Sequence, residues 1–215
     1  MRNINIAIIN YECGNIHSAR KAFELALNEL NISGSVTVTN EPEIIFRADK
    51  LVLPGVGAFA ECFNKLTSIK GLKESISERV HDHGIPILGI CVGLQLMADK
   101  GFENIESKGL GWVPGSVENL YPDDKNLKIP HMGWNEVNFK RDDGKFSDLN
   151  GKDFYFVHSY YFNVKNTNNI LATTNYNQPF PSAIIKKNII GTQFHPEKSQ
   201  RSGVEFIKRF LMWKP

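Results

Sequence analysis

The first half of the chain alternates between short apolar runs and longer segments with helical spacing. In the first longer segment, Ala19, Phe23 and Ala26 recur at intervals of three and four residues. Strands that alternate with helices predict a parallel sheet covered by helices on both faces. The expected strands are Ile4–Asn10, Val36–Thr39, Lys50–Leu53 and Ile85–Ile90, and the expected helices are Asn15–Leu30, Ala58–Leu66, Leu72–Asp82 and Val92–Lys100.

The second half changes to short strand-like segments separated by Gly, Asn, Asp and Pro, which are common turn residues. These segments are Val117–Leu120, Asn135–Phe139, Phe154–Val157, Tyr160–Val164, Leu171–Thr174, Ala183–Ile185 and Ile189–Gln193. A last helix is expected after Ser199, a suitable N-cap residue. We therefore expect an α/β fold with a central, mostly parallel sheet flanked by helices and an added antiparallel β region. Residues 1–215 are expected to form one domain, since the sequence contains no linker and no repeat.

Composition limits the classes of function. Hydrophobic residues make up 41% of the 215 residues and charged residues 22%, and the net charge of +2 does not indicate a nucleic-acid partner or a membrane surface. No apolar run approaches the roughly 18 residues of a membrane span. Cys13, Cys62 and Cys91 are unevenly spaced, so we expect neither a disulfide framework nor a metal site. Free thiols are typical of the cytoplasm, where the protein is expected to work.

Cys91 lies between two glycines at the end of an apolar run, in the segment Leu88–Gln95. A nucleophile on a sharp turn from strand to helix has an unusual backbone conformation, and side chains two positions before and after it would collide. Gly89 and Gly93 remove those side chains. A helix beginning at Val92 would also direct its positive end toward the sulfur, which favours the reactive thiolate. An inert core cysteine is the plain alternative, and the paired glycines make it the less favoured one.

A segment near the C-terminus supplies a base and a carboxylate. His195 and Glu197 are two positions apart, and Pro196 between them stiffens the backbone. The expected strand Ile189–Gln193 ends just before them, and sites in α/β sheets form at the carboxyl ends of strands. A thiol nucleophile needs a base, and the base needs a group that orients it. The sequence therefore predicts Cys91 as nucleophile, with the histidine as base and the glutamate as the orienting carboxylate.

The segment Pro54–Phe59 follows an expected strand and contains a Gly-x-Gly pattern. Glycines let backbone amides turn toward a negatively charged oxygen, so the amides of Gly57 and Val92 are expected to form an oxyanion hole. A tight turn without a catalytic role is the plain alternative. The pattern lacks the third glycine of a dinucleotide-binding fingerprint, and we expect no cofactor.

Three of these segments together resemble the class I, or triad, glutamine amidotransferases. They read Gly-Ile-Cys-Val-Gly-Leu-Gln around Cys91, Phe-His-Pro-Glu-Lys-Ser around His195, and Pro-Gly-Val-Gly-Ala-Phe from Pro54 onward. Two more, Ile129–Asn135 and Val157–Phe162, resemble the glutaminase subunit of imidazole glycerol phosphate synthase. The five segments occur in the family's order, and the match covers nearly the whole chain. The resemblance implies a flavodoxin-like fold.

The resemblance also implies the substrate, the partner and the roles of further residues. Cys91 would attack the side-chain amide of L-glutamine, and His195 would protonate the departing ammonia and then activate water against the thioester. The glutamine-binding residues would be Gln95, Glu103, Ser159 and Tyr160, and the residues near the subunit interface and ammonia entrance would be Asn15, Tyr155 and Lys198. Ammonia would pass to a (β/α)₈-barrel cyclase subunit of a heterodimer, which makes imidazole glycerol phosphate and aminoimidazole carboxamide ribotide in histidine biosynthesis.

One segment departs from the family pattern and leaves further functions open. The family's first loop usually reads Asp-Tyr-Gly-x-Gly-Asn, whereas this chain has Asn-Tyr-Glu-Cys-Gly-Asn from Asn10 to Asn15. The resemblance implies that this loop faces the partner, and related subunits supply ammonia to sugar-modifying enzymes of surface polysaccharides. A stand-alone cysteine hydrolase and a non-catalytic binding module are two further possibilities. Gln95 and Glu103 resemble a glutamine pocket and argue against the hydrolase, while the intact Cys-His-Glu set argues against the binding module.

Overall fold

A nine-stranded sheet forms the centre of the structure, a computed structural model that describes residues 3–122, 124, 127–140 and 144–215. Its strand order is β2-β1-β3-β4-β13-β12-β11-β8-β9. The parallel strands are β1 (Ile4–Ile9), β2 (Gly34–Thr39), β3 (Lys50–Gly55), β4 (Ile87–Cys91) and β13 (Ile189–Thr192). The antiparallel extension consists of β8 (His131–Phe139), β9 (Lys152–His158), β11 (Ile170–Tyr176) and β12 (Gln178–Lys186).

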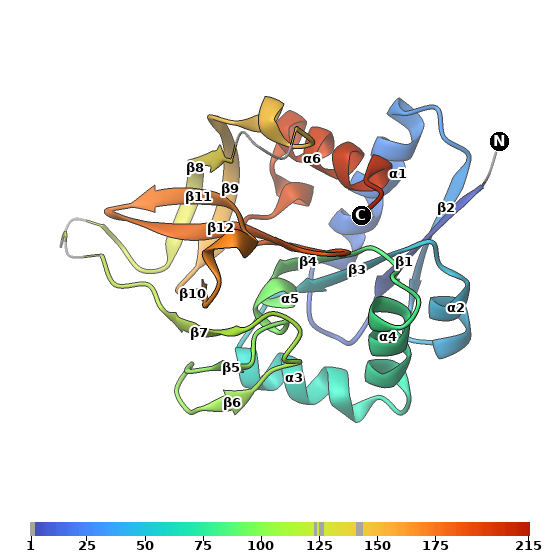
Figure 1. Cartoon of the computed structure of the whole chain (residues 1–215), viewed down its shortest axis with the longest axis horizontal. Coiled ribbons are helices and arrows are strands. Elements are labelled where there is room, and N and C mark those ends of the chain that lie inside the picture. The colour runs from blue at the N-terminus through green and yellow to red at the C-terminus, as the bar shows by residue number, and fades with distance from the viewer. Residues whose placement is uncertain (1–2, 123, 125–126, 141–143) are drawn as a thin grey trace.

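Helices cover both faces of the parallel half of this sheet (Figure 1). On one face α1 (Ile16–Glu29) packs against α6 (Gln200–Met212). On the other lie α2 (Pro42–Arg47), α3 (Phe59–Ser68) and α4 (Leu72–His81). The apolar residues that predicted the first helix by their spacing are the ones it buries. The predicted α/β architecture is confirmed.

A second, four-stranded sheet lies beside the carboxyl edge of the parallel strands (Figure 1). It consists of β10 (Tyr160–Val164), β7 (Gly115–Asn119), β5 (Lys100–Gly101) and β6 (Ser107–Lys108), in that order. The first two match predicted strands, but β5 and β6 are too short to produce a periodic signal. In the described part of the chain, no helix is both long and apolar enough to cross a membrane.

Strand register brings the segments singled out in the sequence to one place. Gly55 at the end of β3 is paired with Cys91 at the end of β4, and Ile90 is paired with Thr192 at the end of β13. The three strands are parallel, so their carboxyl ends meet at the same edge. His195 is the third residue after β13, which places all three segments together.

The prediction of a helix over Val92–Lys100 is wrong in its extent, because the observed helix α5 covers only Val92–Gln95. Its continuation is prevented by a segment further along the chain. The carbonyl groups of Leu96, Met97 and Ala98 accept hydrogen bonds from the backbone amides of residues 110–113, so they are not available to continue the helix.

Ser199 stands at the predicted N-cap position of α6, but its side chain makes no capping hydrogen bond. Its hydroxyl instead donates to the His195 carbonyl at 2.6 Å and accepts from the Tyr155 amide at 2.9 Å. These two bonds take the place of the expected capping bond. The Ser199 hydroxyl ties the segment that carries His195 to β9.

Candidate active site

The Cys91 turn has the strained geometry that its glycines predict. The backbone of Cys91 has φ 53° and ψ −111°, a conformation with positive φ that residues other than glycine rarely adopt. A Cβ at Gly89 would lie 2.8 Å from the Gly93 carbonyl oxygen, and a Cβ at Gly93 would overlap the Leu53 carbonyl oxygen. The glycines therefore allow β3, β4 and α5 to approach closely and leave the sulfur at the strand end.

His195 and Glu197 form a buried pair beside this turn. His195 Nδ1 lies 2.8 Å from Glu197 Oε1, and the side chains are 1% and 4% exposed. Glu197 belongs to the 3₁₀ turn η4 (Pro196–Lys198), which fixes its position relative to the ring. Within the described residues, the other ring nitrogen, Nε2, is buried and makes no hydrogen bond. The pair therefore has the base-and-orienter geometry that the spacing predicts.

The charge of His195 depends on the neighbouring thiol. Burial alone lowers the pKa of His195, but the charge of the Cys91 thiolate and the hydrogen bond to Glu197 outweigh it and raise that pKa to about 10. At neutral pH the histidine is therefore an imidazolium next to the Cys91 sulfur. An imidazolium in this position is a proton donor that is ready before a substrate arrives.

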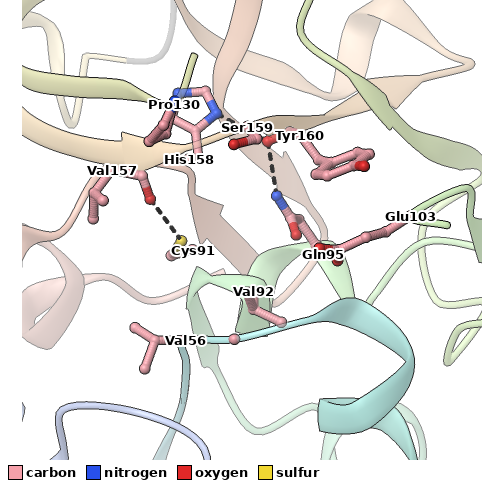
Figure 2. Close-up of a pocket in the computed structure, with 11 residues that line it drawn as sticks. Val56, Cys91, Val92, Gln95, Glu103, Pro130, Val157, His158, Ser159 and Tyr160 are labelled. Atoms are coloured by element: carbon pink, nitrogen blue, oxygen red, sulfur yellow. Dashed lines mark hydrogen bonds between the residues drawn. The ribbon is translucent and has the colours of Figure 1, made fainter.

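A pocket of about 280 Å³ opens above Cys91 (Figure 2). Its lining combines the Cys91 turn, the loop after β3 and the segment around β9 and β10. The lining residues are Val56, Gly57, Cys91, Val92, Gln95, Glu103, Pro130, Val157, His158, Ser159 and Tyr160. The structure thus brings together Cys91, both residues of the predicted oxyanion hole and all four predicted glutamine-binding residues.

The predicted binding residues also hold one another in place. Gln95 Nε2 donates to the Tyr160 carbonyl at 2.9 Å, so its side chain points toward the backbone between Ser159 and Tyr160 (Figure 2). Glu103 accepts from the Phe59 amide at 2.7 Å, which satisfies an end amide of α3 that has no side-chain cap. The carboxylate of Glu103 is thereby held at the pocket wall.

Gly57 and Val92 follow the ends of neighbouring strands and line the same pocket as the sulfur. Gly57 has φ 119°, which only glycine adopts readily, so this loop depends on its glycine. Val92 is the first residue of α5 and directly follows Cys91. Their roles in holding an oxyanion stay a prediction.

The three residues predicted near the interface lie outside this pocket. Tyr155 and Lys198 are neighbours, because Lys198 Nζ lies 5.9 Å from the centre of the Tyr155 ring. Trp134 is also close to this pair, with its ring 6.1 Å from Tyr155. Asn15 is the N-cap of α1 and accepts from the Ser18 amide at 3.3 Å, so it has at least a structural role.

Gln193 was not among the predicted site residues, although it contacts the sulfur. Its Nε2 lies 3.6 Å from Cys91 Sγ, and its Oε1 lies 3.1 Å from Gln95 Nε2. A signal was present in the sequence, because Gln193 precedes His195 by two positions at the end of a strand. Side chains at that spacing point to the same side.

His158 and His131 form a second polar group that the sequence did not reveal. The Tyr160 carbonyl can only accept, so His158 Nδ1, 2.9 Å away, carries the proton. His158 Nε2 then accepts from His131 Nδ1 at 3.0 Å, and His131 Nε2 accepts from Asn135 Nδ2 at 3.2 Å. Burial lowers the pKa of His158 to about 3 and that of His131 to about 4, so both are neutral, as the network requires.

Comparison with known proteins gives relatives over the full chain. The family model for glutamine amidotransferase class-I matches residues 13–213. Imidazole glycerol phosphate synthase subunit HisH of Bradyrhizobium diazoefficiens is 47% identical, and that of Rhodopseudomonas palustris is 45% identical. Each alignment covers 99% of this chain and the whole of the relative.

Solved structures share the fold at low sequence identity. A crystal structure of a glutamine amidotransferase has a TM-score of 0.71 at 16% identity and covers 96% of this chain and 97% of its own. Another, from Thermotoga maritima, has a TM-score of 0.61 at 19% identity and covers 99% and 84%. The chain therefore belongs to the class-I glutamine amidotransferase family, among the relatives named imidazole glycerol phosphate synthase subunit HisH.

Proposed function

We propose that this chain is the glutaminase subunit of an imidazole glycerol phosphate synthase. It hydrolyses L-glutamine to glutamate and ammonia and delivers the ammonia to a cyclase subunit. The observation that carries the proposal is the placement of Cys91 beside the His195–Glu197 pair, at the floor of a pocket lined by Gln95 and Glu103. Full-length relatives with that name support the choice of acceptor.

The proposed reaction proceeds through a thioester. The Cys91 sulfur attacks the side-chain amide carbon of glutamine, and the amides of Gly57 and Val92 hold the resulting oxyanion. His195 gives its Nε2 proton to the amide nitrogen, so that the carbon–nitrogen bond breaks and ammonia leaves. Water then attacks the thioester, His195 takes its proton, and glutamate departs as the carbon–sulfur bond breaks. Glu197 keeps the ring oriented through both steps.

Binding of the amino-acid end of glutamine is assigned to the opposite pocket wall. The Glu103 carboxylate suits the α-ammonium group by charge, and Gln95, Ser159 and Tyr160 complete the wall. Burial and the charge of Glu103 raise the pKa of Tyr160, so its hydroxyl stays protonated beside that carboxylate. The pocket therefore offers an anion where the substrate carries its positive charge.

The proposed partner-binding surface consists of Met132, Trp134, Tyr155 and Lys198, and is called the β8 surface below. Met132 and Trp134 are 61% and 48% exposed on β8, and Pro130 just before this strand lines the pocket. Large apolar side chains exposed beside a functional pocket are typical of protein interfaces. We assign this surface to a (β/α)₈-barrel cyclase subunit.

The three cysteines, Cys13, Cys62 and Cys91, are free thiols, which is in keeping with a protein that works in the cytoplasm.

The experiment measures glutamate release from glutamine by the purified chain, alone and with the cyclase subunit of its organism and that subunit's ribonucleotide substrate. The proposal expects strong stimulation and coupled formation of imidazole glycerol phosphate. In Cys91→Ala, glutamine hydrolysis should be abolished, while added ammonia still supports the cyclase in the complex.

Two results would contradict the proposal. Glutamate release that is fast alone and unaffected by the cyclase would favour a stand-alone hydrolase or another acceptor, such as a sugar-modifying enzyme. Glutaminase turnover that survives in Cys91→Ala would remove the thioester mechanism.

A further inference from the structure

Gln193 joins the glutamine pocket to the nucleophile through a continuous hydrogen-bond chain. Gln95 Nε2 donates to the Tyr160 carbonyl at 2.9 Å and to Gln193 Oε1 at 3.1 Å. Gln193 Nε2 then lies 3.6 Å from Cys91 Sγ. The Gln193 side chain is fully buried and does not line the pocket. It therefore touches the reacting sulfur without touching the space for substrate.

The direction of this chain is determined by its first member. A backbone carbonyl can only accept, so the Gln95 atom that faces Tyr160 must be the amide nitrogen. The same nitrogen faces Gln193, which must present its oxygen. The Gln193 nitrogen is then left for the sulfur. The opposite orientation of Gln193 would place two amide nitrogens together and direct an oxygen lone pair at the thiolate.

Val157 and Gln193 both contact the Cys91 sulfur and favour opposite protonation states of it. The Val157 carbonyl, 4.0 Å from Sγ, accepts a proton and suits the neutral thiol (Figure 2). Gln193 donates and suits the thiolate. Because α5 has only one turn, the helix that was expected to stabilise the anion is short. A directed amide donor therefore adds local stabilisation to that of the His195 imidazolium.

We propose that Gln193 is a catalytic residue that holds Cys91 as a thiolate and couples its position to occupancy of the glutamine pocket. Both hydrogens of the Gln95 amide are used within the protein, so only its oxygen is left to meet a substrate. Substrate bound to Gln95 therefore acts on the Gln95–Gln193 contact and through it on the sulfur. This assignment deepens the proposed glutaminase function and rests on it.

The test compares two variants with a matched control. Gln193→Glu keeps an oxygen for Gln95 but presents a second oxygen to the sulfur, and Gln193→Met keeps the length without any donor. The control is Gln178→Glu, the same change at an exposed position of β12. Iodoacetamide alkylation of the Cys91 peptide is followed by mass spectrometry across a range of pH. kcat and KM for glutamine are measured in the complex with the cyclase subunit.

Both variants should move the alkylation profile to higher pH and lower kcat by about 10- to 100-fold, the range expected for one hydrogen bond to a charged group. Gln193→Glu should change KM much less than kcat, since the contact to Gln95 is kept. Gln178→Glu should match the wild type. An unchanged alkylation profile would overturn the proposal even if kcat fell, because Gln193 would then only shape the pocket.

Cooperative thermal unfolding establishes that each variant is folded. If a variant does not fold, Gln193→Asn, which is uncharged and shorter, is tested in its place. Alkylation of Cys91 requires neither glutamine nor a partner. Failure of the proposed function would appear as missing glutamate release in the wild type, and the alkylation profiles would still decide the role of Gln193.

Discussion

Among single residues, His195 has the property that matters most for the proposed chemistry. A buried imidazole ordinarily loses its proton, yet the thiolate and Glu197 raise the pKa of His195 to about 10. In Cys91→Ser the neighbouring group stays neutral, so we expect the pKa of His195 to fall well below its wild-type value. NMR titration of ¹⁵N-labelled histidines measures it.

Cys13→Ser is the control for this titration, because that buried thiol is not among the groups that shift His195. An unchanged titration of His195 in Cys91→Ser would show that Glu197 alone sets its charge.

The buried neutral histidines His131 and His158 should make the free energy of unfolding depend on pH in mild acid. The unfolded chain takes up protons near pH 6.5, whereas burial lowers the folded pKa values to about 4 and about 3. Between these values the unfolded state binds more protons, so the free energy of unfolding should fall as the pH falls below about 6.5. Each histidine should contribute up to about 1.4 kcal/mol per pH unit.

Urea unfolding of His131→Gln and of the exposed control His17→Gln, measured near neutral pH and in mild acid, checks this prediction. The pH dependence should become shallower in His131→Gln only. Equal slopes in both variants would mean that the buried histidines do not govern acid stability.

For the secondary-structure elements, the close approach of β3 to α5 decides whether the Cys91 turn can form. Gly93→Ala would place a Cβ against the Leu53 carbonyl oxygen and push the two elements apart. We expect a loss of about 1–3 kcal/mol or more in the free energy of unfolding, together with loss of glutaminase activity. Thermal or urea unfolding measures the first.

Gly84→Ala is the control for this substitution. Gly84 has φ 65° and open space around its Cβ position, so the cost there should be about 1 kcal/mol, from backbone strain alone. Equal stability of the two variants would show that the turn can relax around the added methyl group.

Elements differed in how well the sequence predicted them. α1 was predictable because its apolar residues recur along one face over several turns. α5 was not, because residues 110–113 take the carbonyl groups that a longer helix would need. β5 and β6 are two-residue strands that carry no periodicity of their own; β5 pairs with both β6 and β7.

On the scale of the whole molecule, the β8 surface is the proposed contact with the cyclase subunit. Trp134→Ala should weaken binding by about 2 kcal/mol or more, the typical cost at an aromatic anchor, and reduce stimulation of glutamate release. The fold of the Trp134→Ala variant should not change, because the Trp134 side chain is half exposed. Titration of the variant with the cyclase subunit measures both effects.

Met212→Ala is the control, because Met212 is also apolar and is 58% exposed at the end of α6. The backbone carbonyl of its neighbour Trp213 accepts a hydrogen bond from Lys50 at the start of β3. Met212 is therefore far from the carboxyl ends of the strands, where the site lies. Equal loss of binding in both variants would place the partner elsewhere.

The sequence by itself determined the alternation of strands and helices in the first half, apart from α2, and singled out Cys91, His195 and Glu197. Both depend on local patterns: apolar periodicity within one element, glycines two positions from a nucleophile, and a base two positions from a carboxylate. The tertiary structure alone decided that Gln193 meets Cys91 across 102 positions and Gln95 meets Tyr160 across 65. Such contacts depend on the register of neighbouring strands. That register depends on which faces of distant strands pack into one core, so it is decided only when those segments come together.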